Sequence, residues 1–240
     1  FFNLLKKTTI IKNMFNKIIE DTSKVIVGNL DKIKLTLAAI ISEGSILIED
    51  YPGSGKTTFA KAITSSLGLN FKRIQFTSDL LPSDVLGFNI LSDDKLKFQK
   101  GPIFTNIVLA DELNRGSPKA QSAFLEAMEE KNVTIDGESY NLPEPFFVIA
   151  TQNPMDTSGT SSLPDSQLDR FMISYSLSDL DQKEKILMLK KKISFSNSAS
   201  ETINWSQIND KRNEITIKDE IYQYVVEIEQ TIKALGQSIY

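Results

Sequence analysis

The stretch Ser45-Ile46-Leu47-Ile48-Glu49-Asp50-Tyr51-Pro52-Gly53-Ser54-Gly55-Lys56-Thr57 decides the fold of this chain. A short apolar run leads into a glycine-rich turn, and a helical segment is expected to follow. This is the strand–loop–helix context of a phosphate-binding loop. Gly53 and Gly55 let the backbone curl around an anion, and the following helix adds the positive end of its dipole. Asp50 departs from the usual pattern, which opens on glycine. A purely structural turn is the alternative, and the Gly-Lys-Thr sequence after a buried strand argues against it.

The amino-acid composition excludes several classes of enzyme chemistry. The chain has 240 residues, 40% of them hydrophobic, which is enough for one large domain or for one large and one small domain. Cysteine and histidine are both absent, which excludes disulfides, Ser-His-Asp triads and almost every zinc enzyme. Phosphoryl transfer needs neither residue. With 27 basic and 31 acidic residues, the net charge of −4 offers no general attraction for nucleic acid.

The hydrophobic pattern predicts a doubly wound α/β sheet with the nucleotide at the carboxyl ends of its strands. Strands are expected at 45–49, 71–76, 107–110, 146–150 and 172–177, and helices at 14–26, 31–42, 56–67 and from Ser117-Pro118 onward. Two turn-centred segments, 87–99 and 132–142, predict β-hairpins that project from this core, with surface decoration as the alternative.

The last part of the chain has a different pattern. Beyond about residue 179 only helices are expected, at 181–192 and 217–234, joined by the polar stretch 194–202. We therefore predict a nucleotide-binding core over 1–178, with 1–23 as an extension, and a partial helical lid over 179–240. Apolar residues of the final helix are expected to stay partly exposed: Ile221, Tyr224, Val225, Ile228 and Ile232.

A second chemical motif is the acidic pair Asp111-Glu112, which ends the apolar run 107–110. Asp111 is suited to holding Mg²⁺ through water, and Glu112 to accepting a proton from the water that attacks the γ-phosphate. An ordinary acidic pair at the start of a helix is the alternative. The residues expected to bind nucleotide are Pro52, Gly53, Ser54, Gly55, Lys56, Thr57, Thr58 and Asp111, and those expected to hold the metal are Thr57 and Asp111. ATP and Mg²⁺ are the predicted cofactors.

Two further residues are ambiguous from spacing alone. Asn153 follows the strand at 146–150, where an amide could contact the γ-phosphate, but an Asn before proline is also ordinary turn chemistry. Arg170 lies between apolar residues, so it could form a local salt bridge or reach a neighbouring subunit's nucleotide as an arginine finger.

The chain resembles the MoxR-type ATPases of the AAA+ superfamily. The matching stretches, in order, are Val25–Gly28, Glu49–Thr57, Leu80–Gly87, Lys100–Phe104, Leu109–Arg115, Gln121–Glu130, Ala150–Pro154 and Leu163–Phe171. An ordered set of this kind is far more specific than a phosphate-binding loop by itself.

The resemblance implies a P-loop sheet of strand order 5-1-4-3-2 with two hairpin inserts, the first of them in the second helix. It assigns Asn153 as the sensor-1 residue and Arg170 as the arginine finger, so that Glu112, Asn153 and Arg170 form the expected catalytic set. It further implies ATP hydrolysis, a homo-oligomeric ring that is usually hexameric, and chaperone-like remodelling of partners. Such partners often carry a von Willebrand factor A domain or receive a metal or cofactor.

Two alternatives stay open at this stage. One is a nucleotide-gated binding module with little turnover, and the other is a DNA-translocating motor, although the hairpins mix lysines with acidic residues and form no basic stripe. No apolar stretch is long enough to span a membrane and the start does not resemble a secretory signal, so a cytoplasmic location is expected. The first residue is not Met and no sensor-2 arginine is recognisable before Leu235-Gly236, which predicts a chain that lacks part of its lid.

Overall fold

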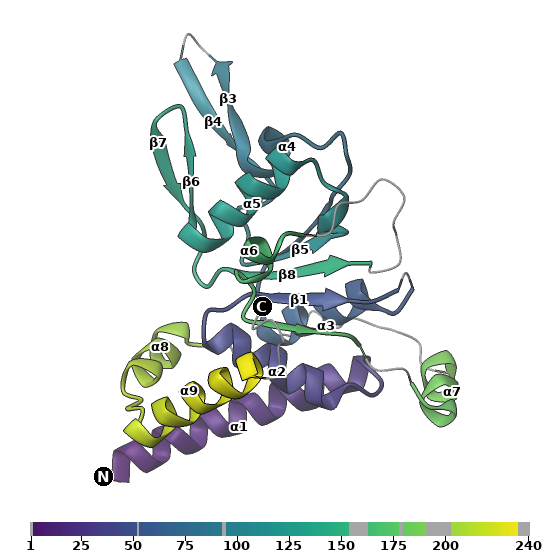
Figure 1. Cartoon of the computed structure of the whole chain (residues 1–240), viewed down its shortest axis with the longest axis vertical. Coiled ribbons are helices and arrows are strands. Elements are labelled where there is room, and N and C mark those ends of the chain that lie inside the picture. Colours follow the sequence, from purple (N-terminus) through teal and green to yellow (C-terminus); the bar gives the residue numbers. More distant parts are fainter. Residues whose placement is uncertain are drawn as a thin grey trace.

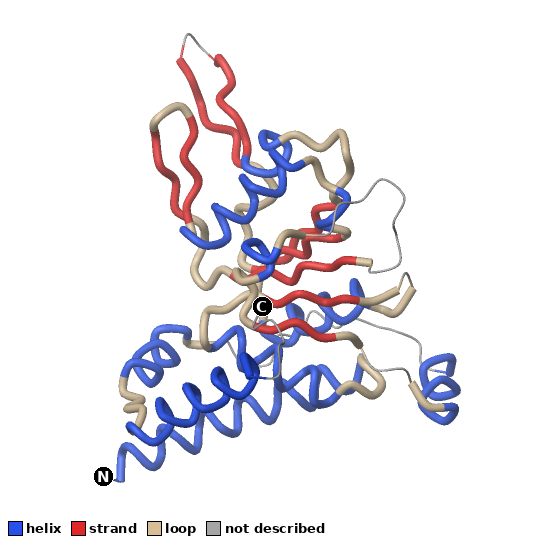
Figure 2. The backbone as a smooth tube through the Cα atoms, in the orientation of Figure 1, coloured by secondary structure: helices blue, strands red, loops and turns tan. Residues whose placement is uncertain are grey.

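The computed structural model of the chain describes residues 2–51, 53–92, 95–153, 163–177, 180–190 and 203–234, with side chains described from residue 13 onward. Its centre is a five-stranded parallel sheet in the order β2-β5-β8-β1-β9 (Figures 1 and 2). The strands are β1 (Ile46–Glu49), β2 (Phe71–Gln75), β5 (Ile107–Asp111), β8 (Phe147–Gln152) and β9 (Ile173–Tyr175). Counted along the chain, this is the predicted order 5-1-4-3-2.

Alternation along the strands gives the sheet two buried faces. Odd and even positions point to opposite sides, and all five residues of β5 are buried. On one face Ile46, Ile107 and Phe147 join a cluster with side chains of α1 (Phe2–Val25), α2 (Leu30–Ile41) and α3 (Lys56–Leu67). On the other face Leu47, Val108 and Val148 pack with α4 (Pro82–Leu86) and α5 (Pro118–Glu130). These two clusters, one on each face, hold the strand ends in fixed positions.

Both predicted hairpins are present and lie side by side. The first is β3 (Gly87–Ser92) with β4 (Lys95–Lys100), and the second is β6 (Asn132–Ile135) with β7 (Glu138–Asn141). Figure 1 shows both projecting beyond α4 and α5, away from the N-terminal helices. Phe98 stacks on Tyr140 with ring centroids 4.1 Å apart, and Asn89 donates to Asp136 at 2.7 Å. The first hairpin follows α4, but residues 101–106 after it form turns and no second helical piece.

The C-terminal helices are α7 (Gln182–Lys190), α8 (Trp205–Asn213) and α9 (Asp219–Ala234). The sequence pattern predicted the first and last but missed α8, because its residues are mostly polar and carry little periodicity. Its N-cap Asn204 accepts from the N–H of Gln207, and Ile208 packs into the cluster beneath α2. The expected exposure on α9 is confirmed: four residues are exposed and Ile232 is half-buried, the four being Ile221, Tyr224, Val225 and Ile228. The division into core and lid stays a prediction.

Two short elements complete the fold: a single turn of 3₁₀ helix, η1 (Leu113–Arg115), and α6 (Asp165–Leu168). Among the residues that the structure describes, no helix is long and apolar enough to cross a membrane.

Candidate nucleotide site

The phosphate-binding loop joins β1 to α3 as the sequence predicts. Gly53 and Gly55 have φ of 85° and 91°, in the left-handed region that residues with a Cβ rarely adopt. A Cβ at either position would meet nothing within 4 Å, so the backbone conformation and not crowding explains glycine here. Gly55 is the N-cap of α3, which directs the helix N-terminus at the loop. The cradle for an anion is therefore built into the backbone.

Lys56 is anchored over this loop by its own backbone. Its Nζ donates to the carbonyl oxygens of Asp50 at 2.6 Å and of Tyr51 at 2.9 Å. Burial lowers the pKa of Lys56 below its ordinary value, while the charges of Asp50, Asp111 and Glu112 act in the opposite direction. The ammonium is thus partly desolvated, and a desolvated cation interacts strongly with phosphate oxygens.

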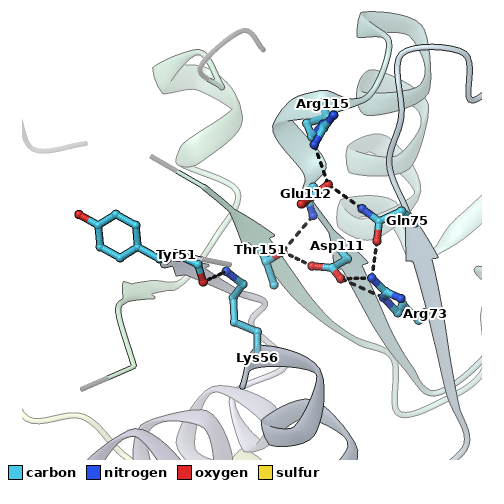
Figure 3. Close-up of polar contacts among 8 residues, drawn as sticks. All are labelled: Tyr51, Lys56, Arg73, Gln75, Asp111, Glu112, Arg115 and Thr151. Carbon is cyan, nitrogen blue, oxygen red and sulfur yellow. Dashed lines mark hydrogen bonds and ion pairs between the residues drawn. The ribbon is translucent and has the colours of Figure 1, made fainter. Parts of the chain in front are cut away.

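The acidic pair lies at the carboxyl end of β5, and both residues are tied to neighbouring strands (Figure 3). Asp111 is only 7% exposed. Its Oδ1 accepts from the hydroxyl of Thr151 at 2.6 Å, and its Oδ2 accepts from Nε and Nη2 of Arg73 at 2.9 and 2.6 Å. A buried carboxylate needs such partners, because an unpaired one is costly.

Glu112 takes an unusual backbone conformation, with φ 53° and ψ 47°. The left-handed region is uncommon for a residue with a Cβ and marks a local constraint. Its N–H donates to the Thr151 hydroxyl at 2.9 Å, so one buried hydroxyl on β8 holds both acidic residues. The Glu112 Oε2 accepts from Gln75 at 2.8 Å and lies 3.4 Å from Nη1 of Arg115.

A polar cavity of about 350 Å³ brings the predicted groups together. Its lining comes from the loop, the start of α3, the middle of β2 and the ends of β5 and β8: Gly53, Ser54, Gly55, Lys56, Thr57, Thr58, Arg73, Asp111, Glu112 and Asn153. Because parallel strands end at one edge of the sheet, residues far apart in sequence meet here. Pro52 lies outside the described residues. Arg170 is not among the described lining residues, and its Nη1 lies 3.2 Å from the Glu129 carboxylate on α5.

A second cavity, of about 110 Å³ and mostly apolar, adjoins the loop. Ser54, Gly55, Thr58 and Asn29 line it together with apolar residues: Val25, Ile26, Val27, Phe59, Leu177, Leu180 and Met188. A Cβ on Gly28 would come within 2.9 Å of Leu180 and Glu184, so glycine allows α7 to approach this closely. An apolar slot beside a phosphate loop is suited to a flat aromatic base.

The residues present fit Mg²⁺ at the polar cavity. Magnesium takes hard oxygen ligands, usually one or two from the protein with the rest from phosphates and water. The Thr57 hydroxyl and the Asp111 carboxylate both line the cavity and supply such a set. The described residues contain no cluster of three acidic side chains, as an all-protein metal cage would need.

Sequence reasoning found the loop, the acidic pair and Asn153, and the structure places them around one cavity. It missed Arg73, Gln75 and the residues of the apolar slot. Nothing in the local sequence marks Arg73 or Gln75, since their place depends on the pairing of β2 with β5. The stretch Val25–Gly28 matches the family pattern, but nothing in its sequence indicates a part in nucleotide binding.

Comparison with known proteins decides the family. Residues 45–173 match the family described as "ATPase family associated with various cellular activities (AAA)". The chain is 43% identical over 224 residues to the uncharacterized protein YeaC of Bacillus subtilis, and the match covers 90% of this chain and 70% of that protein. It is 40% identical over 154 residues to the chaperone MoxR1 of Mycobacterium tuberculosis, covering 63% and 41%. The chain belongs to the MoxR-type ATPases of the AAA+ superfamily.

A solved structure supports the same assignment. A protein of Cytophaga hutchinsonii with a provisional ATPase assignment superposes with a TM-score of 0.83 at 37% identity, over 94% of this chain and 70% of that one. The protein MoxR of Methylorubrum extorquens is 28% identical over 159 residues, and the match covers 46% of it. The match thus covers less than half of the length of these relatives named MoxR, so the activity and partners of the whole protein are matters for proposal.

Proposed function

We propose that this protein binds ATP together with Mg²⁺ and hydrolyses it, and that it uses the cycle to remodel a partner protein. The observation that carries the proposal is the polar cavity, where the phosphate-binding loop, the acidic pair and Asn153 converge. Few other chemistries need a glycine cradle, a lysine and two adjacent carboxylates within one cavity.

Each residue has a stated part. The N–H groups of the loop and Lys56 hold the phosphates, and the apolar slot accepts the base. Glu112 accepts the proton of the attacking water, and Asn153 orients the γ-phosphate. When bound, Mg²⁺ held by Thr57 and Asp111 supplies charge neutralisation at the terminal phosphates.

The assembled form is part of the proposal. AAA+ relatives generally form rings, and the resemblance indicates a hexamer in which Arg170 acts on the neighbouring subunit's nucleotide. Its pairing with Glu129 in a single chain is compatible with this, because an ion pair between partly exposed residues is weak and can open. The name of the mycobacterial relative, a chaperone, supports remodelling as the output. A client with a von Willebrand factor A domain, and metal or cofactor insertion, rest on the resemblance.

A second candidate is a nucleotide-gated binding module that turns over negligibly. One observation favours it: the Glu112 carboxylate already accepts from Gln75 and lies next to Arg115. These contacts occupy the Oε2 acceptor that the attacking water would otherwise use.

The experiment that separates the two candidates measures ATP binding and phosphate release for the wild type and for Glu112→Gln. We expect Glu112→Gln to bind ATP as the wild type does and to hydrolyse it slower by a factor of about 10² or more, the usual effect of removing a general base. Glu126→Gln is the control, since it makes the same charge change on the exposed face of α5. A wild type that binds ATP but releases no phosphate, with or without a partner, would establish the binding module instead.

A further inference from the structure

Five polar side chains form one uninterrupted chain of contacts along the edge of the sheet (Figure 3). Arg73 donates twice to Oδ2 of Asp111, from Nε at 2.9 Å and Nη2 at 2.6 Å. The same Nη2 donates to Oε1 of Gln75, and Nε2 of Gln75 donates to Oε2 of Glu112 at 2.8 Å. Arg115 follows at 3.4 Å from that oxygen. The metal-binding carboxylate and the expected base are therefore linked through two residues of β2.

Strand geometry explains why β2 can make this link. Gln75 pairs with Asp111 in the parallel register of β2 and β5. Arg73 lies two residues earlier and so faces the same side of the sheet. A long side chain there reaches the diagonal neighbour across the strand pair.

The chemistry of Arg73 fixes which way the Gln75 amide points. A guanidinium has donors only, so the amide must turn its oxygen toward Arg73. Its nitrogen then faces Glu112, which accepts from it. Without Arg73 the amide keeps only its contact with Glu112, which still favours the nitrogen on that side but leaves the oxygen end of the Gln75 side chain unheld in this chain of contacts.

Arg73 also competes for Asp111. The Asp111 carboxylate is buried, and Arg73 is the cation paired with it among the described residues. The Arg73 side chain is 48% exposed, so it can withdraw toward solvent. A divalent cation near Asp111 and the guanidinium would repel each other, since like charges at such a site disfavour one another.

We propose that Arg73 is a positioning residue that competes with the metal for Asp111 and, by its second contact, orients Glu112 through Gln75. The proposal rests on the proposed function, because it assigns a regulator to the same site. Metal affinity and base orientation are then set by a single side chain on the edge strand.

The test measures two quantities for each variant: the Mg²⁺ concentration at half-maximal ATP binding, and the rate of phosphate release. Arg73→Met should lower the Mg²⁺ midpoint by about threefold to tenfold, because a partly exposed charge-assisted contact no longer competes. It should also slow turnover. Lys72→Met on the same strand is the matched control, and it should change neither quantity, since Lys72 is exposed and points to the opposite side.

Two more variants separate the two effects. Arg73→Lys keeps the charge but loses the planar fork that contacts both Asp111 and Gln75. It should keep the Mg²⁺ midpoint within about twofold of the wild type and slow turnover, since a residual charge contact is worth little more than that. Gln75→Ala should slow turnover and leave the midpoint unchanged. In the double variant Arg73→Met/Gln75→Ala, the turnover losses should not multiply, because both substitutions break the same series of contacts from Arg73 through Gln75 to Glu112.

The outcomes are distinct. If the Mg²⁺ midpoint of Arg73→Met equals or exceeds that of Lys72→Met, Arg73 does not compete with the metal for Asp111. If the turnover losses multiply in the double variant, Arg73 does not orient Glu112 through Gln75. If Arg73→Met damages the structure in general, it should also weaken ATP binding in the absence of Mg²⁺. In that case the Arg73→Lys variant tests the orientation of Glu112 through Gln75. Wild-type turnover in Arg73→Lys would overturn that part of the proposal. A wild type that binds ATP but never hydrolyses it refutes the proposed function while the midpoint test still stands.

Discussion

The Thr151→Val substitution tests the two hydrogen bonds by which one hydroxyl holds Asp111 and Glu112 in the polar cavity. The Thr151 side chain is fully buried, donates to Asp111 at 2.6 Å and accepts from the N–H of Glu112 at 2.9 Å. Valine has the same shape but can do neither. We expect the charge-assisted bond to account for about 1.5–3 kcal/mol and the unpaired N–H for about 1–3 kcal/mol. Extra apolar burial by the valine methyl offsets about 1 kcal/mol.

The net expectation is a loss of about 1.5–5 kcal/mol in the free energy of unfolding. For a chain of this size that corresponds to a decrease in melting temperature of about 3–20 °C. Thr64→Val is the control: Thr64 is also buried, and its hydroxyl donates to the carbonyl of Ala60 within α3. That variant should change stability by less than about 1 kcal/mol. Calorimetry and denaturant unfolding measure both, and a Thr151→Val protein no less stable than Thr64→Val would refute the reasoning.

Three further predictions concern binding, assembly and pH. Lys56→Ala should abolish binding of a fluorescent ATP analogue, because the cation that faces the terminal phosphates is lost; unchanged affinity would contradict the loop assignment. Arg170→Ala should reduce turnover about 10³-fold in the ring, and mixing it with Glu112→Gln subunits should restore part of it; no recovery in verified mixed rings would place Arg170 in its own subunit's chemistry or in packing. The hydrogen bond from Lys131, with Arg212 beside it, lowers the pKa of Glu43 below 4.5. The ion pair therefore stabilises the folded state fully above the ordinary pKa of Glu, and this stabilisation is lost as the pH falls through the lowered pKa of Glu43. Glu43→Gln should accordingly cost about 0.5–1 kcal/mol at pH 7, with the difference from the wild type disappearing in acid unfolding curves; a difference that persists below the lowered pKa would exclude the ion pair as its cause.

Much of the fold could be predicted because its signals are local. The apolar runs at 45–49 and 107–110 mark strands buried on both faces, and Asp136-Gly137 marks a hairpin turn, without knowledge of the rest of the chain. Helix α8 escaped prediction for the opposite reason. Its polar residues form a helix because Ile208 and Trp205 pack beneath α2, a contact made with residues about 170 positions earlier.

The sequence by itself predicted a phosphate-binding loop and two carboxylates that could act on the phosphate, because the strand, the glycine turn, the lysine and the acidic pair each occupy a few adjacent residues. Only the tertiary structure decided which side chains hold those carboxylates. Arg73 and Gln75 reach Asp111 and Glu112 because β2 pairs with β5 in one register, and Thr151 reaches both because β8 lies on the other side of β5. The register of parallel strands is set by packing on both faces of the sheet, which no local stretch of sequence contains.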